Sequence, residues 1–269
     1  MGAVYQTNCK ASMSTVKSGD IYSVGGHVIG CGSSLDTAFV SQVIGDQKIQ
    51  AIVTDPPYGV AYVENKKDVA KLGTKDTKVI KGDHIQSEQE YGEFTSGWIR
   101  AILPHIDTYN TFHIFGCDSM FLAMREGIRS SDMHFSQMLV WLKNQPVMGR
   151  MDYLPQHELI AYGWYGKHKR PSAQMKNAIY HPRPQKSKLH PTQKPLGLLR
   201  KLIRNTTNID DTVYDGFLGS GSTSLACAQL GRACIGIEQD SEYVEICLKR
   251  LEKLTKQKRT LITTYESKS

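Results

Sequence analysis

The segment from Thr212 to Glu238 constrains the fold most strongly. It reads as a short apolar strand, a glycine-rich turn, a helix and a second strand that ends in an acidic residue. The turn is Asp215-Gly-Phe-Leu-Gly-Ser-Gly-Ser-Thr223, whose glycines let the backbone approach a ligand closely. Glu238 follows Gly221 by 17 residues, near the spacing at which an acid accepts hydrogen bonds from ribose hydroxyls. This layout predicts an α/β fold with a site for an adenosine-bearing ligand, and a purely structural strand-to-helix turn is the alternative.

A tetrapeptide earlier in the chain, Asp55-Pro56-Pro57-Tyr58, follows the mostly apolar run from Ile49 to Val53. Such a run predicts a strand buried on both faces, which places Asp55 just past its carboxyl end. The four residues suit methylation of the exocyclic amine of a base, whose lone pair is delocalised into the ring. Asp55 and a backbone carbonyl near Pro56 can accept its two N–H groups, and Tyr58 offers a face on which the base stacks. A loop merely stiffened by its prolines is the structural alternative.

The tetrapeptide also selects among ligands for the glycine-rich turn. It has no role in hydride transfer, so S-adenosylmethionine is favoured over a dinucleotide. That cofactor carries an activated methyl group, and no metal is required for the transfer. The six cysteines include no C-x-x-C pair and the nine histidines no H-E-x-x-H pattern, so we expect no metal site.

Composition is that of an ordinary globular protein. The 269 residues are 40% hydrophobic and 22% charged, and no apolar stretch reaches the length of a membrane span. The first residues lack the charged and then apolar layout of a signal peptide. Cysteines within expected helices and strands are typical of a reducing compartment, so we predict a cytoplasmic protein with no membrane partner.

Positive charge is concentrated in one part of the chain. The segment from Lys143 to Arg204 holds thirteen Lys or Arg and two acidic residues, a local charge of +11 within a total of +7. A basic segment on an otherwise slightly acidic body suits the phosphate backbone of double-stranded DNA, although a solvated loop is the alternative. We expect DNA contacts from the basic residues of this segment, namely Lys167, Lys169, Arg170, Arg183, Lys186 and Lys188.

The chain reads as a single domain of alternating strands and helices over residues 1–269. Residues 59–87 are polar and lysine-rich and predict a lid-like loop over the site, and residues 166–189 predict a small basic insertion for target recognition. The expected strands are Ile21 to Val24, His27 to Ile29, Ile49 to Val53, Thr111 to Phe115, Phe135 to Leu142, Glu158 to Tyr162, Thr212 to Asp215 and Ala233 to Glu238. The expected helices are Leu35 to Ile44, Ser87 to Leu103, Ser119 to Ile128, Pro195 to Asn205, Ser222 to Leu230 and Ser241 to about Lys256.

Over most of its length the chain resembles the β-class of amino-methylating DNA methyltransferases, the N6-adenine and N4-cytosine enzymes. The tetrapeptide and the glycine loop carry the resemblance, together with Cys31-Gly-Ser-Ser34, Trp141-Leu-Lys-Asn144 with its continuation to Trp164, and His190-Pro-Thr-Gln-Lys-Pro195. The resemblance implies a Rossmann-like methyltransferase fold: a mixed, largely parallel sheet with helices on both faces, circularly ordered so that the catalytic motif precedes the cofactor motif.

The resemblance also assigns residues. Asp55, Pro56 and Tyr58 are expected to be catalytic, with Pro57 shaping the turn. The expected cofactor contacts are Asp215, Phe217, Gly219, Gly221, Ser222, Glu238, Thr192 and Lys194. Two positions depart from the family pattern: Gly216 stands where the family often has Pro, and Ser33 stands where it often has Asp. His157-Glu158 is interpreted as structural or positioning, since successive strand residues face opposite ways.

The predicted function is methyl transfer from S-adenosylmethionine to N6 of adenine in DNA, after the base has been flipped out of the duplex. Asp in the first position of the tetrapeptide favours adenine, since many N4-cytosine enzymes carry Ser there. N4-cytosine methylation is the alternative, and RNA or a protein amide is a more remote substrate. A non-catalytic DNA-binding or cofactor-sensing module is the competing class. The sequence leaves open whether the protein forms a homodimer and whether it works with a cognate restriction enzyme.

Overall fold

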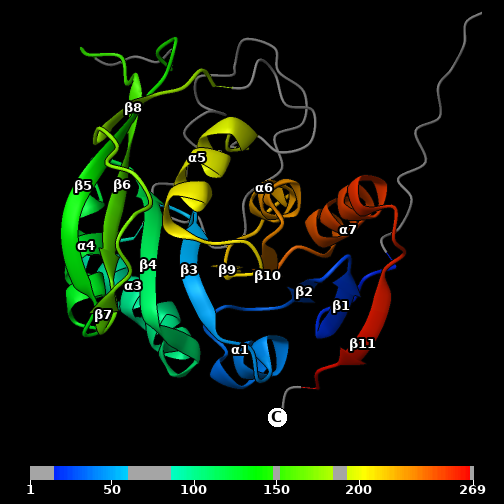
Figure 1. Ribbon diagram of the computed structural model, residues 1–269. Coiled ribbons are helices and arrows are strands. Elements are labelled where there is room, and N and C mark those ends of the chain that lie inside the picture. The colour runs from blue at the N-terminus through cyan, green and yellow to red at the C-terminus, as the bar shows by residue number, and fades with distance from the viewer. Residues whose placement is uncertain (1–14, 60–85, 148–151, 184–192, 267–269) are drawn as a thin grey trace, which may run out of the picture.

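The computed structural model describes residues 15–59, 86–147, 152–183 and 193–266. The predicted lid-like loop lies almost wholly outside these residues, as do Thr192, Lys186 and Lys188. Each predicted helix and strand within the described ranges is present, with ends shifted by a few residues. The α/β prediction, with a mixed and mostly parallel sheet, is confirmed (Figure 1).

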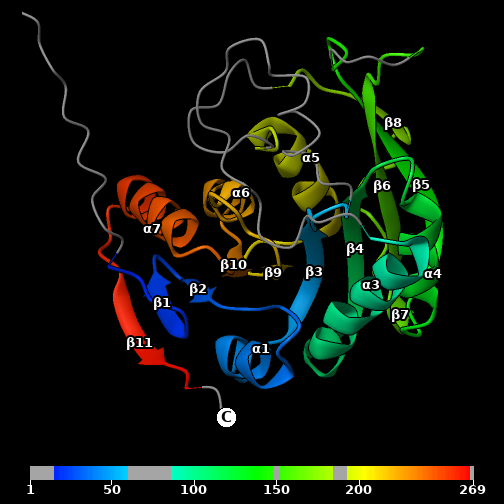
Figure 2. The same cartoon turned by 180° about the vertical axis from the view of Figure 1, so that it is seen from behind.

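Helices cover both faces of the sheet (Figures 1 and 2). Three of them, α5, α6 and α7, pack with one side of the central strands, and α1, α3 and α4 pack with the other. Strand β3 contributes to both cores: Ala51 and Val53 lie in the first cluster and Ile52 in the second. The helices are α1 (Thr37–Ile44), α3 (Glu88–Ile102), α4 (Phe121–Arg129), α5 (Leu196–Thr206), α6 (Ser222–Leu230) and α7 (Ser241–Thr255).

Strand order across the sheet is β11-β1-β2-β10-β9-β3-β4-β6-β5-β8, with β7 paired to β4. The run from β2 to β4 is parallel, and β6 is antiparallel to both of its neighbours. The strands are β1 (Asp20–Val24), β2 (His27–Cys31), β3 (Ile49–Thr54), β4 (Ile106–Gly116), β5 (His134–Leu142), β6 (His157–Trp164), β7 (Lys167–His168), β8 (Ala178–Tyr180), β9 (Thr212–Asp215), β10 (Ala233–Glu238) and β11 (Thr260–Thr264).

Local sequence explains where several helices begin. Asp36 caps α1 by accepting hydrogen bonds from the amides of Ala38 and Phe39. Ser87 and Glu90 form a reciprocal capping box at the start of α3. Gly221, the residue before α6, adopts a left-handed conformation. Among the described residues, no side chain caps the start of this helix.

Three short strands were absent from the sequence prediction. β7 and β8 lie in the basic segment that shows no periodicity, and β11 pairs with β1 at the edge of the sheet. The pairing of β7 has a consequence for the basic insertion. β7 pairs with Tyr109 and Asn110 near the amino end of β4. Thr54 at the end of β3 pairs with Ile114, further along β4. Ile114 lies four positions after Asn110, which is roughly 13 Å along the strand.

Candidate active site

The two predicted motifs leave adjacent parallel strands at the same edge of the sheet. In β3, Ala51 and Ile52 pair with Val213 and Tyr214 of β9. The hydroxyl of Thr54, the last residue of β3, donates to Asp215 Oδ1 at 2.7 Å. The carboxyl ends of parallel strands are where α/β folds place their ligand sites. The structure therefore brings the Asp55 tetrapeptide and the glycine loop together.

Within the tetrapeptide, Tyr58 is fixed by its hydroxyl. That hydroxyl donates to Asp55 Oδ1 at 2.8 Å and also lies 3.2 Å from Glu158 Oε2. Burial and then the negative charge of Asp55 raise the pKa of Tyr58 well above its usual value, so the hydroxyl stays a donor. Pro56 is buried and Pro57 half-buried at the turn between β3 and Tyr58.

Lys194, expected at the cofactor, lies against the Asp55 tetrapeptide. Its Nζ is 2.5 Å from Asp55 Oδ2, 3.1 Å from Glu158 Oε2 and 3.3 Å from the Tyr58 hydroxyl. The ammonium group also lies 5.1 Å from the centre of the Phe115 ring. The lysine is placed there by the chain immediately before α5, since Pro195 is the N-cap residue of that helix. A contact between Lys194 and the cofactor stays a prediction.

Two further residues complete this site: Glu158, for which the sequence predicted only a structural or positioning role, and Lys143, which the sequence did not single out. Glu158, on β6, holds Lys194 through one carboxylate oxygen and Lys143 through the other, with Lys143 Nζ 2.8 Å from Oε1. Lys143 follows the carboxyl end of β5. A signal was available for both, because each lies within the Trp141 to Trp164 stretch that resembles the family. What the sequence lacked was the register that pairs Trp141 with Glu158.

The charges of this site shift one another's protonation. Burial, followed by the negative charge of Glu158, raises the pKa of Asp55, while Lys194 opposes the shift. Burial also favours the neutral form of Glu158, but the ammonium groups of Lys194 and Lys143 hold its pKa below the usual value. Burial opposes the charge on Lys194, and the two carboxylates outweigh burial and raise the pKa of this lysine.

The glycine loop approaches α7 so closely that a side chain would collide. A Cβ atom on Gly221 would lie 2.4 Å from Cys247 Sγ, and Gly221 adopts a φ of +85°. Gly219 is also left-handed, with a φ of +52°. Ser222 opens α6 and is buried. The Phe217 ring packs against Phe94 and Trp98 of α3, with ring centres 5.6 and 5.8 Å apart.

Glu238, expected to bind ribose hydroxyls, ends β10 beside the glycine loop. Its carboxylate accepts hydrogen bonds from the backbone amides of Gly219 and Asp240, each at 2.8 Å. Burial raises the pKa of Glu238 in spite of these two bonds. A carboxylate has about four acceptor positions, so two of them are left for hydroxyl donors. Nearby, Ser34 donates to the carbonyl of Gly216 and joins the loop after β2 to the glycine loop.

Asp215 gives a testable dependence of stability on pH. Burial raises its pKa to about 6 from 3.8, against hydrogen bonds from Thr223, Thr54 and the amide of Phe217. The folded protein therefore holds this proton more tightly than the unfolded chain. The resulting stabilisation is complete below the unfolded pKa and is lost as the pH rises through about 6.

Substituting Asp215 by Asn removes this titration while it keeps an acceptor for Thr54. Relative to the parent protein, we expect the free energy of unfolding of Asp215→Asn to increase by roughly 2–3 kcal/mol between about pH 4 and about pH 8. Urea denaturation across that range measures the difference. A difference that stays constant with pH would contradict the raised pKa.

The basic insertion is divided between two ends of the sheet. Lys167 and Lys169 lie at the amino end of β4, where Lys167 faces the Tyr109 ring and Lys169 forms an ion pair with Asp211. Arg170, the next residue in the chain, is exposed. Arg183 instead lies near the edge of the sheet that carries Asp55, which is the expected catalytic edge, because its backbone amide donates to Asn144 Oδ1, next to Lys143. The four predicted DNA-contacting residues that the structure describes thus do not form one patch.

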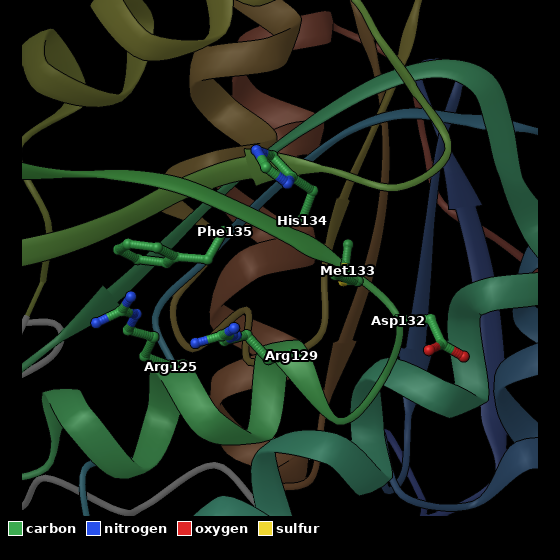
Figure 3. Close-up of a pocket in the computed structure, with 6 residues that line it drawn as sticks. All are labelled: Arg125, Arg129, Asp132, Met133, His134 and Phe135. Carbon is green, nitrogen blue, oxygen red and sulfur yellow. The ribbon is translucent and has the colours of Figure 1, made fainter.

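A separate hollow of about 400 Å³ lies between α4 and β5 (Figure 3). It is lined by Arg125, Arg129, Asp132, Met133, His134 and Phe135. The hollow is at the amino end of β5, whereas Lys143 follows its carboxyl end, so the two sites are distinct. No group of three or more His, Cys, Asp or Glu side chains that could hold a metal occurs among the described residues. Within the same residues, no helix has the length and apolar character needed to cross a membrane.

Comparison with known proteins identifies the family. A family model, N6_N4_Mtase, described as DNA methylase, matches residues 49–249. The chain belongs to this family. It is 26% identical over 235 residues to the Type II methyltransferase M.HpaI of Haemophilus parainfluenzae, covering 77% of this chain and 69% of that protein. It is also 26% identical over 239 residues to M2.LlaDCHI of Lactococcus lactis, covering 81% and 87%.

Among solved structures, the complex of M1.HpyAVI with S-adenosylmethionine superposes with a TM-score of 0.59 at 26% identity. The match covers 82% of this chain and 98% of that one. The predicted Rossmann-like methyltransferase fold and the resemblance to amino-methylating DNA methyltransferases are confirmed. The chain is an enzyme of the DNA methyltransferase class.

Proposed function

We propose that this enzyme transfers a methyl group from S-adenosylmethionine to the N6 amine of adenine in double-stranded DNA. The observation that carries the proposal is the position of the Asp55 carboxylate beside the glycine loop, at the shared edge of β3 and β9. The solved complex of M1.HpyAVI, a protein of similar sequence and fold, contains the same cofactor.

The acceptor side of the reaction is assigned to Asp55. Two of its acceptor positions are used by Tyr58 and Lys194, which leaves two for an N–H of the substrate amine. Such a bond localises the lone pair on nitrogen and offsets the positive charge that develops there. Asp in this position, rather than Ser, supports adenine over cytosine as the substrate.

The residues of the glycine loop fit the cofactor. The turn at Gly221 leaves no room for a side chain. Among the described residues, no side chain caps the start of α6. The carboxylate of Glu238 retains two acceptor positions. Backbone amides at a helix start suit the carboxylate of the cofactor, and Glu238 suits its ribose. The cofactor supplies an activated methyl group, and the chain's own residues orient it and exclude water.

For DNA binding, the split of the basic insertion leads to a prediction about individual residues. Arg183 lies at the catalytic edge and Lys167 at the amino end of β4. We expect Arg183→Ala to weaken DNA binding and to reduce the slope of log affinity against log salt concentration by about one, the effect of one lost phosphate contact. Lys167→Ala, as the matched substitution, is expected to have the smaller effect on both quantities.

Fluorescence anisotropy with a labelled duplex, measured at several salt concentrations, compares the two variants. A larger loss for Lys167→Ala would place the DNA at the other end of the sheet and contradict the proposed binding mode. Cytoplasmic localisation, a homodimer and a cognate restriction enzyme stay predictions, the last supported by the Type II names of the relatives.

Sequence specificity is tested on DNA that carries no prior methylation. After incubation with the enzyme and S-adenosylmethionine, sequencing that detects modified bases maps every methylated position. The proposal predicts modified adenines confined to one short sequence. Modified cytosines would support N4-cytosine methylation instead, and unmodified DNA would contradict the proposed activity.

A further inference from the structure

Four charged residues from four separate segments meet at the catalytic edge. They are Asp55 after β3, Lys143 after β5, Glu158 on β6 and Lys194 before α5, called here the four-charge cluster. The contacts form a chain in which Lys143 holds Glu158 at 2.8 Å, Glu158 holds Lys194 at 3.1 Å, and Lys194 holds Asp55 at 2.5 Å. Two positive and two negative charges balance.

The burial of this cluster requires an explanation. The side chains of both lysines are only 7% exposed, and those of Glu158 and Asp55 are 19% and 23% exposed. Burying charges is unfavourable, and apolar residues of similar size often stabilise a fold as well as a buried ion pair does. The arrangement is therefore weak evidence for a contribution to stability. It is more informative that one end of the chain of contacts is the carboxylate assigned to the substrate amine.

We propose that Lys194 is a positioning residue that keeps Asp55 an oriented anion able to accept the substrate N–H, and that Glu158, anchored by Lys143, holds Lys194 in that position. This inference rests on the proposed function. Lys194 binds Oδ2 and Tyr58 binds Oδ1, so the carboxylate is held through both of its oxygens. Burial alone would favour a protonated Asp55, which is a poorer acceptor than the anion.

The groups that face Asp55 come from each neighbouring element. Lys194 precedes α5, Glu158 is on β6, and Tyr58 is in the same loop as Asp55. Asp215 at the end of β9 is close enough for Asp55 to affect its titration, and Tyr91 of α3 acts on Tyr58. Among the described residues, Lys194 is the cation in direct contact with Asp55, while Glu158 adds an opposing negative charge. The two neighbours therefore have opposite effects on the ionisation of Asp55.

Because Lys194 and Glu158 have opposite effects on the ionisation of Asp55, replacing each of them is expected to shift the pH dependence of the rate in opposite directions. A merely structural role would not produce opposite shifts. In Lys194→Met, Asp55 loses its cation, and the acid limb of the pH–rate profile is expected to move to higher pH by about one unit or more. In Glu158→Gln, the amide oxygen still accepts a hydrogen bond from Lys194 and holds it in place, while the negative charge near Asp55 is lost, so the acid limb is expected to move to lower pH. In the double variant, where Asp55 loses both neighbours, the limb is expected between those of the single variants.

The measurement is the single-turnover rate of methyl transfer against pH, with the enzyme in excess over the DNA and with enzyme and cofactor at saturating concentrations, so that product release does not affect the rate. Lys249→Met is the matched control. It removes a lysine from a Lys–Glu pair, since Lys249 lies 3.2 Å from Glu245 on α7, away from the cluster. We expect its acid limb to coincide with that of the parent protein.

Opposite shifts in the two single variants support the proposal. Limbs that do not move, or that move in the same direction, overturn it. If Lys194→Met does not fold, Glu158→Gln decides alone: a shift to lower pH supports the proposal, and no shift or a shift to higher pH overturns it. Failure of the proposed function is distinguishable, because it would appear as a parent protein that does not methylate DNA.

Discussion

Replacing Asp55 by alanine is expected to abolish methyl transfer while cofactor binding is retained. The carboxylate is the acceptor assigned to the substrate amine, and it lies outside the glycine loop, at the end of the neighbouring strand. Removing one hydrogen-bonding group that stabilises developing charge typically lowers the rate by about 10²–10³-fold. We expect the loss of transfer rate in Asp55→Ala to be larger than this. Single-turnover assays measure the loss, and calorimetric titration with S-adenosylmethionine measures the binding.

Asp46→Ala is the matched control for this experiment. Asp46 is exposed in the turn between α1 and β3, at the opposite end of β3 from Asp55. We expect it to leave both the transfer rate and cofactor affinity unchanged. Full activity in Asp55→Ala would contradict the assigned mechanism. Loss of cofactor binding in Asp55→Ala would show instead that the carboxylate contributes to the cofactor site.

Replacing Gly221 by alanine is expected to destabilise the fold and remove cofactor binding together. The new Cβ would meet Cys247 Sγ at 2.4 Å and Cys247 Cβ at 2.9 Å, at a φ of +85°. The left-handed conformation costs a residue with a side chain about 1–2 kcal/mol, and forcing a methyl group into a packed site costs about 1–3 kcal/mol more. We therefore expect the free energy of unfolding to fall by roughly 2–5 kcal/mol.

Gly231→Ala separates the two contributions. Gly231 is also left-handed, with a φ of +69°, but the nearest atom to its added Cβ would be 3.7 Å away. Only the conformational cost of about 1–2 kcal/mol is expected there, with cofactor affinity unchanged. Urea denaturation and calorimetric titration give both quantities for each variant. Equal losses of stability in the two variants would show that Gly221 is not crowded by Cys247.

Much of the fold was predictable because its signals are local. The glycine loop, the apolar run of β3 and the capping residues Asp36 and Ser87 each determine structure within a few neighbouring positions. The adjacency of Asp55 to the glycine loop also followed, since parallel strands place their carboxyl ends at one edge. β7, β8 and β11 were missed because they are short edge strands defined by their partners rather than by their own periodicity.

The four-charge cluster was not predictable from sequence, and the reason is geometrical. Its members come from positions 55, 143, 158 and 194, and their meeting depends on strand register and on where α5 begins. The alternation argument assigned Glu158 a structural or positioning role but could not say which face of β6 it occupies. The expected role of Lys194 at the cofactor came from the resemblance, whereas its position against Asp55 came only from the structure.

Identifying the methylated nucleoside tests directly whether this enzyme methylates N6 of adenine. The protein is incubated with unmethylated double-stranded DNA and S-adenosylmethionine that carries a labelled methyl group, and the DNA is hydrolysed and its nucleosides are separated. We expect label in N6-methyldeoxyadenosine with the parent protein and none with Asp55→Ala. Label in N4-methyldeoxycytidine, or DNA that stays unlabelled, would contradict this expectation.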